Sequence, residues 1–194
     1  MEESAKIAFM VGGWDPACMD LCVELANLGY KICFADREGG KEPDSRNGGM
    51  NLTGPADLVF PMKEFTAQKI SAAIVDTAER FGGIDALVYQ YNPRFKPSDA
   101  DMLLDLDERD WDEAMNSGVK GFFLTCKFIL PYLISRPPSV IMVLGAQNPS
   151  PAETRLTEYV SIRALDASLE HMSQEVSQYG ISIIRRAVGD GANG

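Results

Sequence analysis

The sequence predicts a doubly wound α/β fold, in which a parallel, Rossmann-like sheet lies between two layers of helices. Short apolar runs that suit buried strands alternate along the chain with longer segments of helical spacing. Because right-handed crossovers place a helix between successive parallel strands, this alternation favours a parallel sheet. The chain has 194 residues, of which 45% are hydrophobic, so it suits one well-buried core and not two. We therefore expect a single domain over residues 1–194.

The first half of the chain predicts four strands and two helices. A glycine turn follows the first apolar run, and Gly29 ends the helix after it. Gly82 and Gly83 precede the fourth strand. Residues 37–56 are rich in Gly, Pro, Asn and charge without periodicity, which indicates an exposed loop. The predicted strands are 6–11, 30–35, 58–60 and 84–89, and the predicted helices are 16–28 and 65–81.

The second half predicts two long helices, each followed by a strand. Apolar residues recur at helical spacing over 110–133, and Pro137-Pro138 stops this helix before a strand at 140–144. The next helix covers about 154–179 and ends at Gly180. A strand at 181–186 leads into a glycine-rich tail, residues 187–194, which we expect to be flexible.

The charge balance argues against nucleic acids and membranes as partners. There are 18 Lys and Arg against 28 Asp and Glu, a net charge of −10, so polyanions are repelled. No continuous apolar run approaches the roughly 18 residues of a membrane helix, and the acidic N-terminus leads directly into a strand. We expect a cytoplasmic protein.

The four cysteines are spread over predicted buried elements and not spaced as a disulfide framework. We expect reduced thiols that pack in the core. Cys18 and Cys22 share a helix face, but His171 is the only histidine, so the sequence predicts no metal site.

In a doubly wound fold, ligands bind beyond the carboxyl ends of the strands. The residues that follow Val11, Ala35, Tyr89 and Leu144 are therefore where we expect a site. Several segments near these positions together resemble the short-chain dehydrogenase/reductase family, and the resemblance covers nearly the whole chain. They are the early glycine turn, Asp36, residues 81–88, residues 111–123 with Gly121, and Tyr159 before a long helix.

The family's first turn reads T-G-x-x-x-G-x-G, where the glycines let the backbone approach a pyrophosphate. Residues 11–18 here read V-G-G-W-D-P-A-C, so the first glycine of the motif is kept as Gly12, with Gly13 beside it. Pro16 lacks an N–H that would bind an anion, and Asp15 adds negative charge beside the expected pyrophosphate. The same two residues also suit an ordinary helix start, as N-cap and first helical residue, and we favour this interpretation.

Other cofactor contacts of the family are weakened as well. Asp36 ends the second strand where, by resemblance, an acidic residue binds the adenosine ribose of NAD. Arg37 can pair with Asp36 or receive the 2′-phosphate of NADP, and no acidic residue follows the third strand in residues 60–63. Tyr89 and Tyr91 stand in the family's N-N-A-G segment, where they either obstruct the cofactor or fill an empty groove. We expect no cofactor, or weakly bound NAD(H).

The family's catalytic set is only partly present. By resemblance, Tyr159 is the general acid/base, and Arg163 stands four residues later, where the family has a lysine. Arginine keeps the positive charge but cannot relay a proton in the useful pH range. The catalytic serine position, thirteen residues before Tyr159, holds Ala146, although Gln147 and Ser150 are nearby.

The family's catalytic asparagine is replaced by Gly118, because Trp111 and Gly121 set the alignment of the first long helix. Asn116 points about 200° around the helix from that position and does not replace it. Tyr159 also suits a half-buried aromatic residue near a helix start. After the sixth strand we expect no substrate-covering insertion and no seventh strand.

We favour a non-catalytic structural or regulatory subunit that pairs with an intact family member through the two long helices, as a homo-oligomer or hetero-oligomer. Five weakened cofactor or catalytic positions are harder to offset than one. The aromatic and Met side chains on those helices could serve such an interface or lie in the domain's own core. They are Phe122, Phe123, Phe128 and Met172.

Two alternatives remain open. The first is a divergent but active NAD-dependent oxidoreductase that acts through Tyr159 on a secondary alcohol, ketone or 3-hydroxyacyl thioester, as the resemblance implies. The second is a sensor or carrier of another ligand in the same crevice, with Trp14, Tyr89 and Tyr91 as stacking surfaces.

Overall fold

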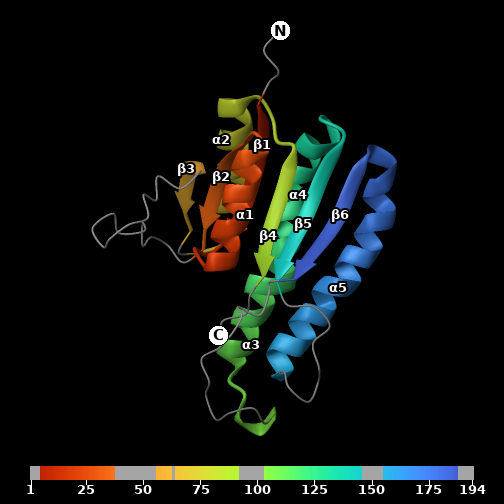
Figure 1. The fold of residues 1–194 in the computed structure, drawn as a ribbon. Coiled ribbons are helices and arrows are strands. Elements are labelled where there is room, and N and C mark those ends of the chain that lie inside the picture. The colour runs from red at the N-terminus through yellow and green to blue at the C-terminus, as the bar shows by residue number, and fades with distance from the viewer. Residues whose placement is uncertain (1–4, 38–55, 63, 92–102, 146–154, 188–194) are drawn as a thin grey trace, which may run out of the picture.

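The computed structural model describes residues 5–37, 56–62, 64–91, 103–145 and 155–187 of the chain. They form a six-stranded parallel sheet with the strand order β3-β2-β1-β4-β5-β6 (Figure 1). The order reverses between β1 and β4, which is the switch point of a doubly wound fold. The predicted fold class is therefore confirmed. The strands are β1 (Lys6–Gly12), β2 (Tyr30–Asp36), β3 (Ala56–Pro61), β4 (Ala86–Tyr91), β5 (Ser139–Gly145) and β6 (Ile181–Ala187).

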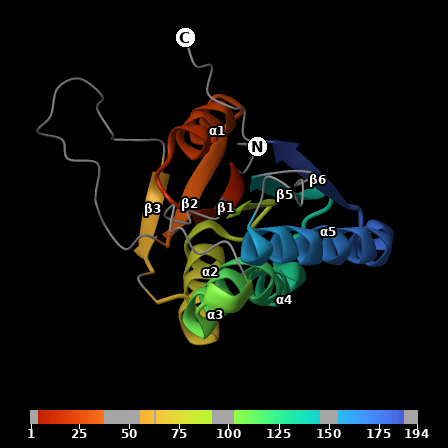
Figure 2. The ribbon, with the colours of Figure 1, turned by 90° about the horizontal axis from the view of Figure 1, so that it is seen from below.

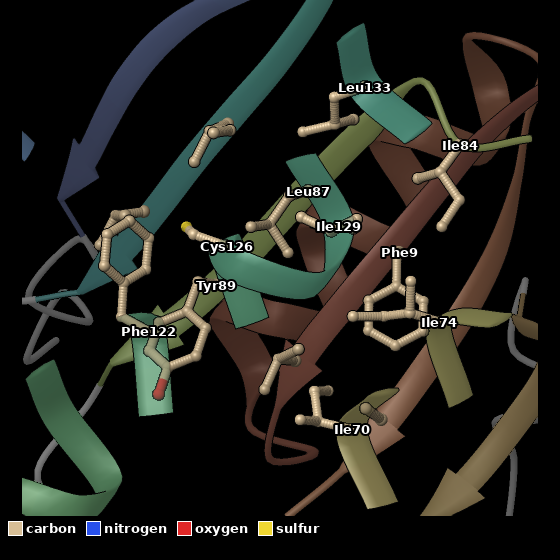
Figure 3. Packing of buried hydrophobic residues seen from close by; sticks show 14 of the residues in the cluster. Phe9, Ile70, Ile74, Ile84, Leu87, Tyr89, Phe122, Cys126, Ile129 and Leu133 are labelled. Atoms are coloured by element: carbon tan, nitrogen blue, oxygen red, sulfur yellow. The ribbon is translucent and has the colours of Figure 1, made fainter. Parts of the chain in front are cut away.

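Helices cover both faces of the sheet (Figure 2). Helix α1 (Pro16–Asn27) lies on one face, and α2 (Ala67–Phe81), α4 (Gly121–Ile134) and α5 (Leu156–Val176) lie on the other. Because side chains of a strand alternate between faces, Met10 packs beneath α1 while Phe9 packs beneath α2 and α4. Figure 3 shows the larger cluster, in which Leu87 of β4 lies near Ile129 of α4.

Several predicted boundaries move by one or two residues. Strand β4 begins and ends two residues later than the predicted 84–89, because the turn through Gly82 and Gly83, both with positive φ, extends to Asp85. The predicted loop at 37–56 and tail at 187–194 lie mostly outside the described residues. At their edges, Ala56 already belongs to β3 and Ala187 to β6.

The helix predicted over 110–133 is not continuous. It consists of α3 (Glu108–Met115), a single π turn η2 (Asn116–Lys120) and α4, with a short 3₁₀ turn η1 (Leu103–Asp105) before it. The break is at Gly118, where φ is −85° and ψ is −108°. A periodicity of apolar residues cannot reveal such a break, because the apolar face continues on both sides of it.

The helix predicted over 154–179 is α5, followed by a 3₁₀ turn η3 (Ser177–Tyr179) that ends at Gly180. Gly180 has a φ of 72°, the left-handed conformation that favours glycine at a helix end.

One segment, Glu108–Ile134, is long and apolar enough to cross a membrane, by length and composition only. We expected no membrane helix because no uninterrupted run of apolar residues is long enough. This segment reaches the limit only when hydropathy is averaged over a window that includes polar residues. Core helices pass the same test, and Phe122, Ile129 and Leu133 of this segment are fully buried against the sheet. The segment is therefore weak evidence for a membrane span.

Candidate functional site

The glycine turn lies at the carboxyl end of β1, where the fold would place a nucleotide. Asp15 is the N-cap of α1: its Oδ1 accepts a hydrogen bond from the backbone N–H of Cys18 at 2.9 Å. Pro16 is the first helical residue, where its missing N–H has no intrahelical partner to lose. The favoured interpretation of this pair as a helix start agrees with this geometry.

The Gln90 side chain holds the turn from β4. Its Oε1 accepts a hydrogen bond from the Gly13 N–H at 2.8 Å, and its Nε2 donates to the Asp15 carboxylate. A Cβ on Gly12 would overlap Gln90, so Gly12 is required by this packing, whether or not a ligand approaches. Our sequence analysis missed Gln90, although a polar residue near the end of an apolar strand is a usable signal.

Asp36 and Arg37 occupy the end of β2, beside Gly12. Asp36 pairs with Gly12 in the sheet register and is only 1% exposed. The Arg37 Nη1 donates to the Ser117 carbonyl at 2.8 Å and to the Tyr89 hydroxyl at 3.3 Å. The guanidinium also lies 5.3 Å from the Phe65 ring centroid. Arg37 therefore faces the break between α3 and α4, which neither of the two sequence interpretations of this residue anticipated.

Tyr89 is fully buried and is not available as a stacking surface for a ligand, which corrects one expectation. Its hydroxyl donates to the Ser117 carbonyl at 2.7 Å and lies 3.3 Å from the Gly118 carbonyl. Burial raises the pKa of Tyr89 well above its usual value, and the nearby Arg37 charge only partly offsets this. The Ser117 carbonyl at the helix break is thus satisfied by Arg37, which follows β2, and by Tyr89 of β4.

Tyr91 is 3% exposed, and its ring covers Gly118. A Cβ on Gly118 would lie 3.0 Å from the ring Cζ, closer than nearly all real Cβ contacts. The Tyr91 hydroxyl forms a hydrogen bond with the Ser161 hydroxyl of α5. Burial raises the pKa of Tyr91, while the Ser161 hydrogen bond opposes the shift. Trp14, the third expected stacking surface, stacks on Phe34 with the ring centroids 4.0 Å apart.

Of the positions that match the family's catalytic residues, Gly118, Tyr159 and Arg163 lie within the described part of the chain. Tyr159 is half-buried on the first turns of α5, a degree of burial that suits both interpretations of it. The exposed Arg163 lies 3.9 Å from Asp166, which also pairs with Arg185. Its charge is thus shared with a carboxylate one turn further along α5. Ala146 lies outside the described residues, as do Gln147 and Ser150.

Ser161 is a residue that our sequence analysis missed. It is fully buried and donates to the Glu158 carbonyl at 3.0 Å while it bonds Tyr91. Its position two residues after Tyr159 places it on the inner face of α5 when Tyr159 is half-exposed, and that spacing could have indicated it.

The described part of the chain contains no group of three or more His, Cys, Asp or Glu side chains able to hold a metal ion. All four cysteines are buried and free. Both observations agree with the expectation of thiols packed in the core.

Taken together, the strand order, the glycine turn at the switch point and the acidic end of β2 define a protein of the dinucleotide-binding fold class. The model of the short chain dehydrogenase family matches residues 6–190, and the chain belongs to this family.

Known relatives agree with this assignment. The chain is 32% identical over 115 residues to a probable short-chain type dehydrogenase/reductase of Bradyrhizobium diazoefficiens, covering 59% of this chain and 40% of that protein. It is 33% identical over 93 residues to 2-(R)-hydroxypropyl-CoM dehydrogenase of Xanthobacter autotrophicus, covering 47% and 37%. These matches span well under half the length of either relative.

A solved structure of the NADH-dependent reductase A1-R′ in complex with NAD is similar in fold. Its TM-score is 0.78 at 17% identity, and the match covers 96% of this chain and 80% of that one. At this identity the likeness concerns the fold alone. The chain is therefore a member of an oxidoreductase family whose sheet and layers it shares.

Proposed function

We propose that the protein is a non-catalytic structural or regulatory subunit that pairs with an intact short-chain dehydrogenase/reductase. The observation that carries the proposal is the packing of Tyr91 over Gly118. By the resemblance, Gly118 stands at the position of the family's catalytic asparagine, and a Cβ here would lie 3.0 Å from the Tyr91 ring, so a side chain would require the ring to shift. The Tyr91 ring thus packs against the backbone at the position where the resemblance places the asparagine, and this packing supports a non-catalytic role.

The glycine turn supports the same proposal. Its Gly13 N–H, a donor that an anion could use, is already bonded to Gln90, and the buried carboxylate of Asp15 adds negative charge at the start of α1. A pyrophosphate would have to approach this carboxylate and would find one donor fewer. We therefore expect NAD(H) to bind weakly or not at all.

Helix α4 supplies a surface for the pairing. A helix that covers a sheet usually carries one apolar stripe, whereas α4 is apolar on nearly all sides. Phe122 belongs to the core, but Phe123 is 55% exposed and Ile134 is also exposed. Phe128 of α4 and Met172 of the neighbouring α5 are partly buried against the core. Figure 2 shows α4 and α5 side by side on one face, which suits docking of two helices from a partner subunit.

The pairing is tested by native mass spectrometry and light scattering on the purified protein, alone and co-expressed with an intact family member. We expect a dimer or higher oligomer, and we expect Phe123→Glu to shift it towards monomer. Val23→Glu on α1 is the matched control, because Val23 is 50% exposed on the opposite face. A protein that stays monomeric and binds no family member would overturn the proposal.

The loss of cofactor binding is tested by calorimetric titration with NAD⁺, NADH, NADP⁺ and NADPH. No heat at millimolar cofactor is the expected result. Binding in the micromolar range would instead favour a divergent, active NAD-dependent oxidoreductase.

The position of Asp36 in register with Gly12 is the observation that supports this second candidate. Its reaction would oxidise or reduce a secondary alcohol, ketone or 3-hydroxyacyl thioester, with Tyr159 as acid/base and Arg163 as the nearby positive charge. Tyr159→Phe would then abolish turnover without altering cofactor affinity.

A further inference from the structure

A line of polar and aromatic contacts crosses the carboxyl end of the sheet, from the end of β2 to the start of α5. It begins at Arg37, whose guanidinium reaches both the Tyr89 hydroxyl and the Ser117 carbonyl. Tyr89 in turn bonds the two carbonyls at the helix break, those of Ser117 and Gly118. One side chain from β2 and one from β4 thus hold the same π turn.

The line continues through Gly118 to α5. The Tyr91 ring covers the face of Gly118 on which a side chain would stand, and its hydroxyl bonds Ser161. Ser161 also bonds the Glu158 carbonyl within the first turns of α5. Among the described residues, each member is therefore in contact with the next from Arg37 to Ser161.

We infer that this line couples the nucleotide-facing end of β2 to the first turns of α5. It has one discrete adjustable element, the π turn η2, because Gly118 lacks the side chain that would fix its backbone and because the Ser117 carbonyl accepts hydrogen bonds from Arg37 and Tyr89, which lie outside the turn. An anionic group that draws Arg37 away from Ser117 would remove one hydrogen-bond donor from the π turn. The backbone at Gly118 would then shift, and the packing of the Tyr91 ring against it would loosen. The change then reaches Ser161 and α5.

The inference rests on the proposed function only for the purpose of the coupling, which is to regulate contact with a partner subunit. In a regulatory subunit, α5 lies in the face that meets the partner, so occupancy of the crevice would alter that face. The coupling itself is a property of the isolated chain and stands or falls without any partner.

Hydrogen–deuterium exchange measured by mass spectrometry tests the coupling. Arg37→Ala removes the first contact, and we expect amide exchange to accelerate about fivefold both at 116–121 and at 156–163. Arg80→Ala is the control, because Arg80 pairs with Asp76 on the exposed face of α2, away from the line. Exchange in β1 and β2 serves as the internal reference for global stability.

A second variant tests the other end. Tyr91→Phe keeps the ring over Gly118 and removes the hydroxyl, so exchange should rise at 156–163 and, by reciprocity, at 116–121. Faster exchange at 116–121 alone in Arg37→Ala would overturn the inference, because Arg37 would then act only locally. A uniform rise across β1 and β2 in both variants would overturn it as well.

Discussion

The two ends of the sheet are built by different means. At the amino end, the Arg136 Nε lies 2.8 Å from the Asp85 Oδ1, and the Asp85 Oδ2 accepts a hydrogen bond from the Ile7 N–H at 2.7 Å. Arg136 also donates to the Gly82 carbonyl. A few charged groups here tie α4, β1 and the turn before β4 together.

At the carboxyl end, the described contacts come from an amide, two tyrosines and one arginine, beside the buried carboxylates of Asp15 and Asp36. Gln90 accepts a hydrogen bond from the glycine turn. At the break between α3 and α4, the Ser117 carbonyl accepts hydrogen bonds from Tyr89 and Arg37, and the Tyr91 ring packs on Gly118 while its hydroxyl bonds Ser161. The amino end needs only to hold helices and strands in place, whereas the carboxyl end is where the fold normally leaves room for a ligand. The difference shows that side chains at the carboxyl end of the sheet form hydrogen bonds within the protein itself.

The largest expected effect is that of Gly145→Ala, which would break the packing of the carboxyl end. Gly145 has a φ of 158°, and a Cβ there would overlap the carbonyl of Tyr91, its neighbour in the sheet register. Because a backbone atom cannot yield easily, we expect a loss of about 3 kcal/mol in the free energy of unfolding, measured in urea. Gly29→Ala, also at positive φ but without a close neighbour, should cost only about 1 kcal/mol. Equal losses would show that the positive φ, and not the overlap with the Tyr91 carbonyl, determines the cost of the substitution.

The next effect concerns the amino end. Asp85→Ala leaves the Ile7 N–H and the Arg136 guanidinium without their carboxylate, so we expect a loss of about 2 kcal/mol in thermal or urea unfolding. Asp76→Ala, which removes an exposed i,i+4 pair with Arg80, should stay within about 0.5 kcal/mol. A loss at Asp85 as small as that at Asp76 would contradict the difference drawn between the two ends.

A double-mutant cycle sharpens the account of Gly118. Gly118→Ala places a methyl group 3.0 Å from the Tyr91 ring, and we expect it to cost about 1.5 kcal/mol. In a Tyr91→Ala background the same change should cost little, which gives a coupling energy of about 1 kcal/mol. Additive losses would mean that the Tyr91 ring does not oppose a side chain at position 118.

The smallest expected effect is that of Tyr89→Phe, about 1 kcal/mol near neutral pH, since the Arg37 Nη1 still bonds the Ser117 carbonyl. The pH dependence is more informative. The folded-state pKa of Tyr89 is raised, so above the ordinary value of 10.0 the unfolded chain releases this proton while the folded chain retains it. Wild-type stability must therefore fall as pH rises above about 10, and the variant should fall less steeply. Parallel curves would exclude Tyr89 as the source.

The fold could be predicted because its signals are local. The spacing of apolar residues predicted each described strand and the helices, apart from the break between α3 and α4, and the glycine and proline positions mark most of the ends. The helix start at Asp15 and Pro16 was predictable for the same reason, since cap and first turn lie next to each other in the chain.

The candidate site was predictable only in part. The resemblance identified Gly12, Asp36, Gly118 and Tyr159 as the positions of interest, but it could not say what fills them. Gln90 and Ser161 escaped notice because each meets its partner across about 70 residues or more of sequence. Arg37 was expected either to pair with Asp36 or to receive a 2′-phosphate, and the structure shows that it also bonds a helix break that periodicity does not reveal.

The sequence by itself therefore determined the order of the layers, the parallel sheet and the departures from the family's motifs. Only the tertiary structure showed that Tyr91 and Gly118 are in contact, with a Cβ at position 118 falling 3.0 Å from the Tyr91 ring. The physical reason is steric: two atoms cannot share one volume. Which residues compete for a volume is known only when strands and helices distant in sequence have been brought side by side.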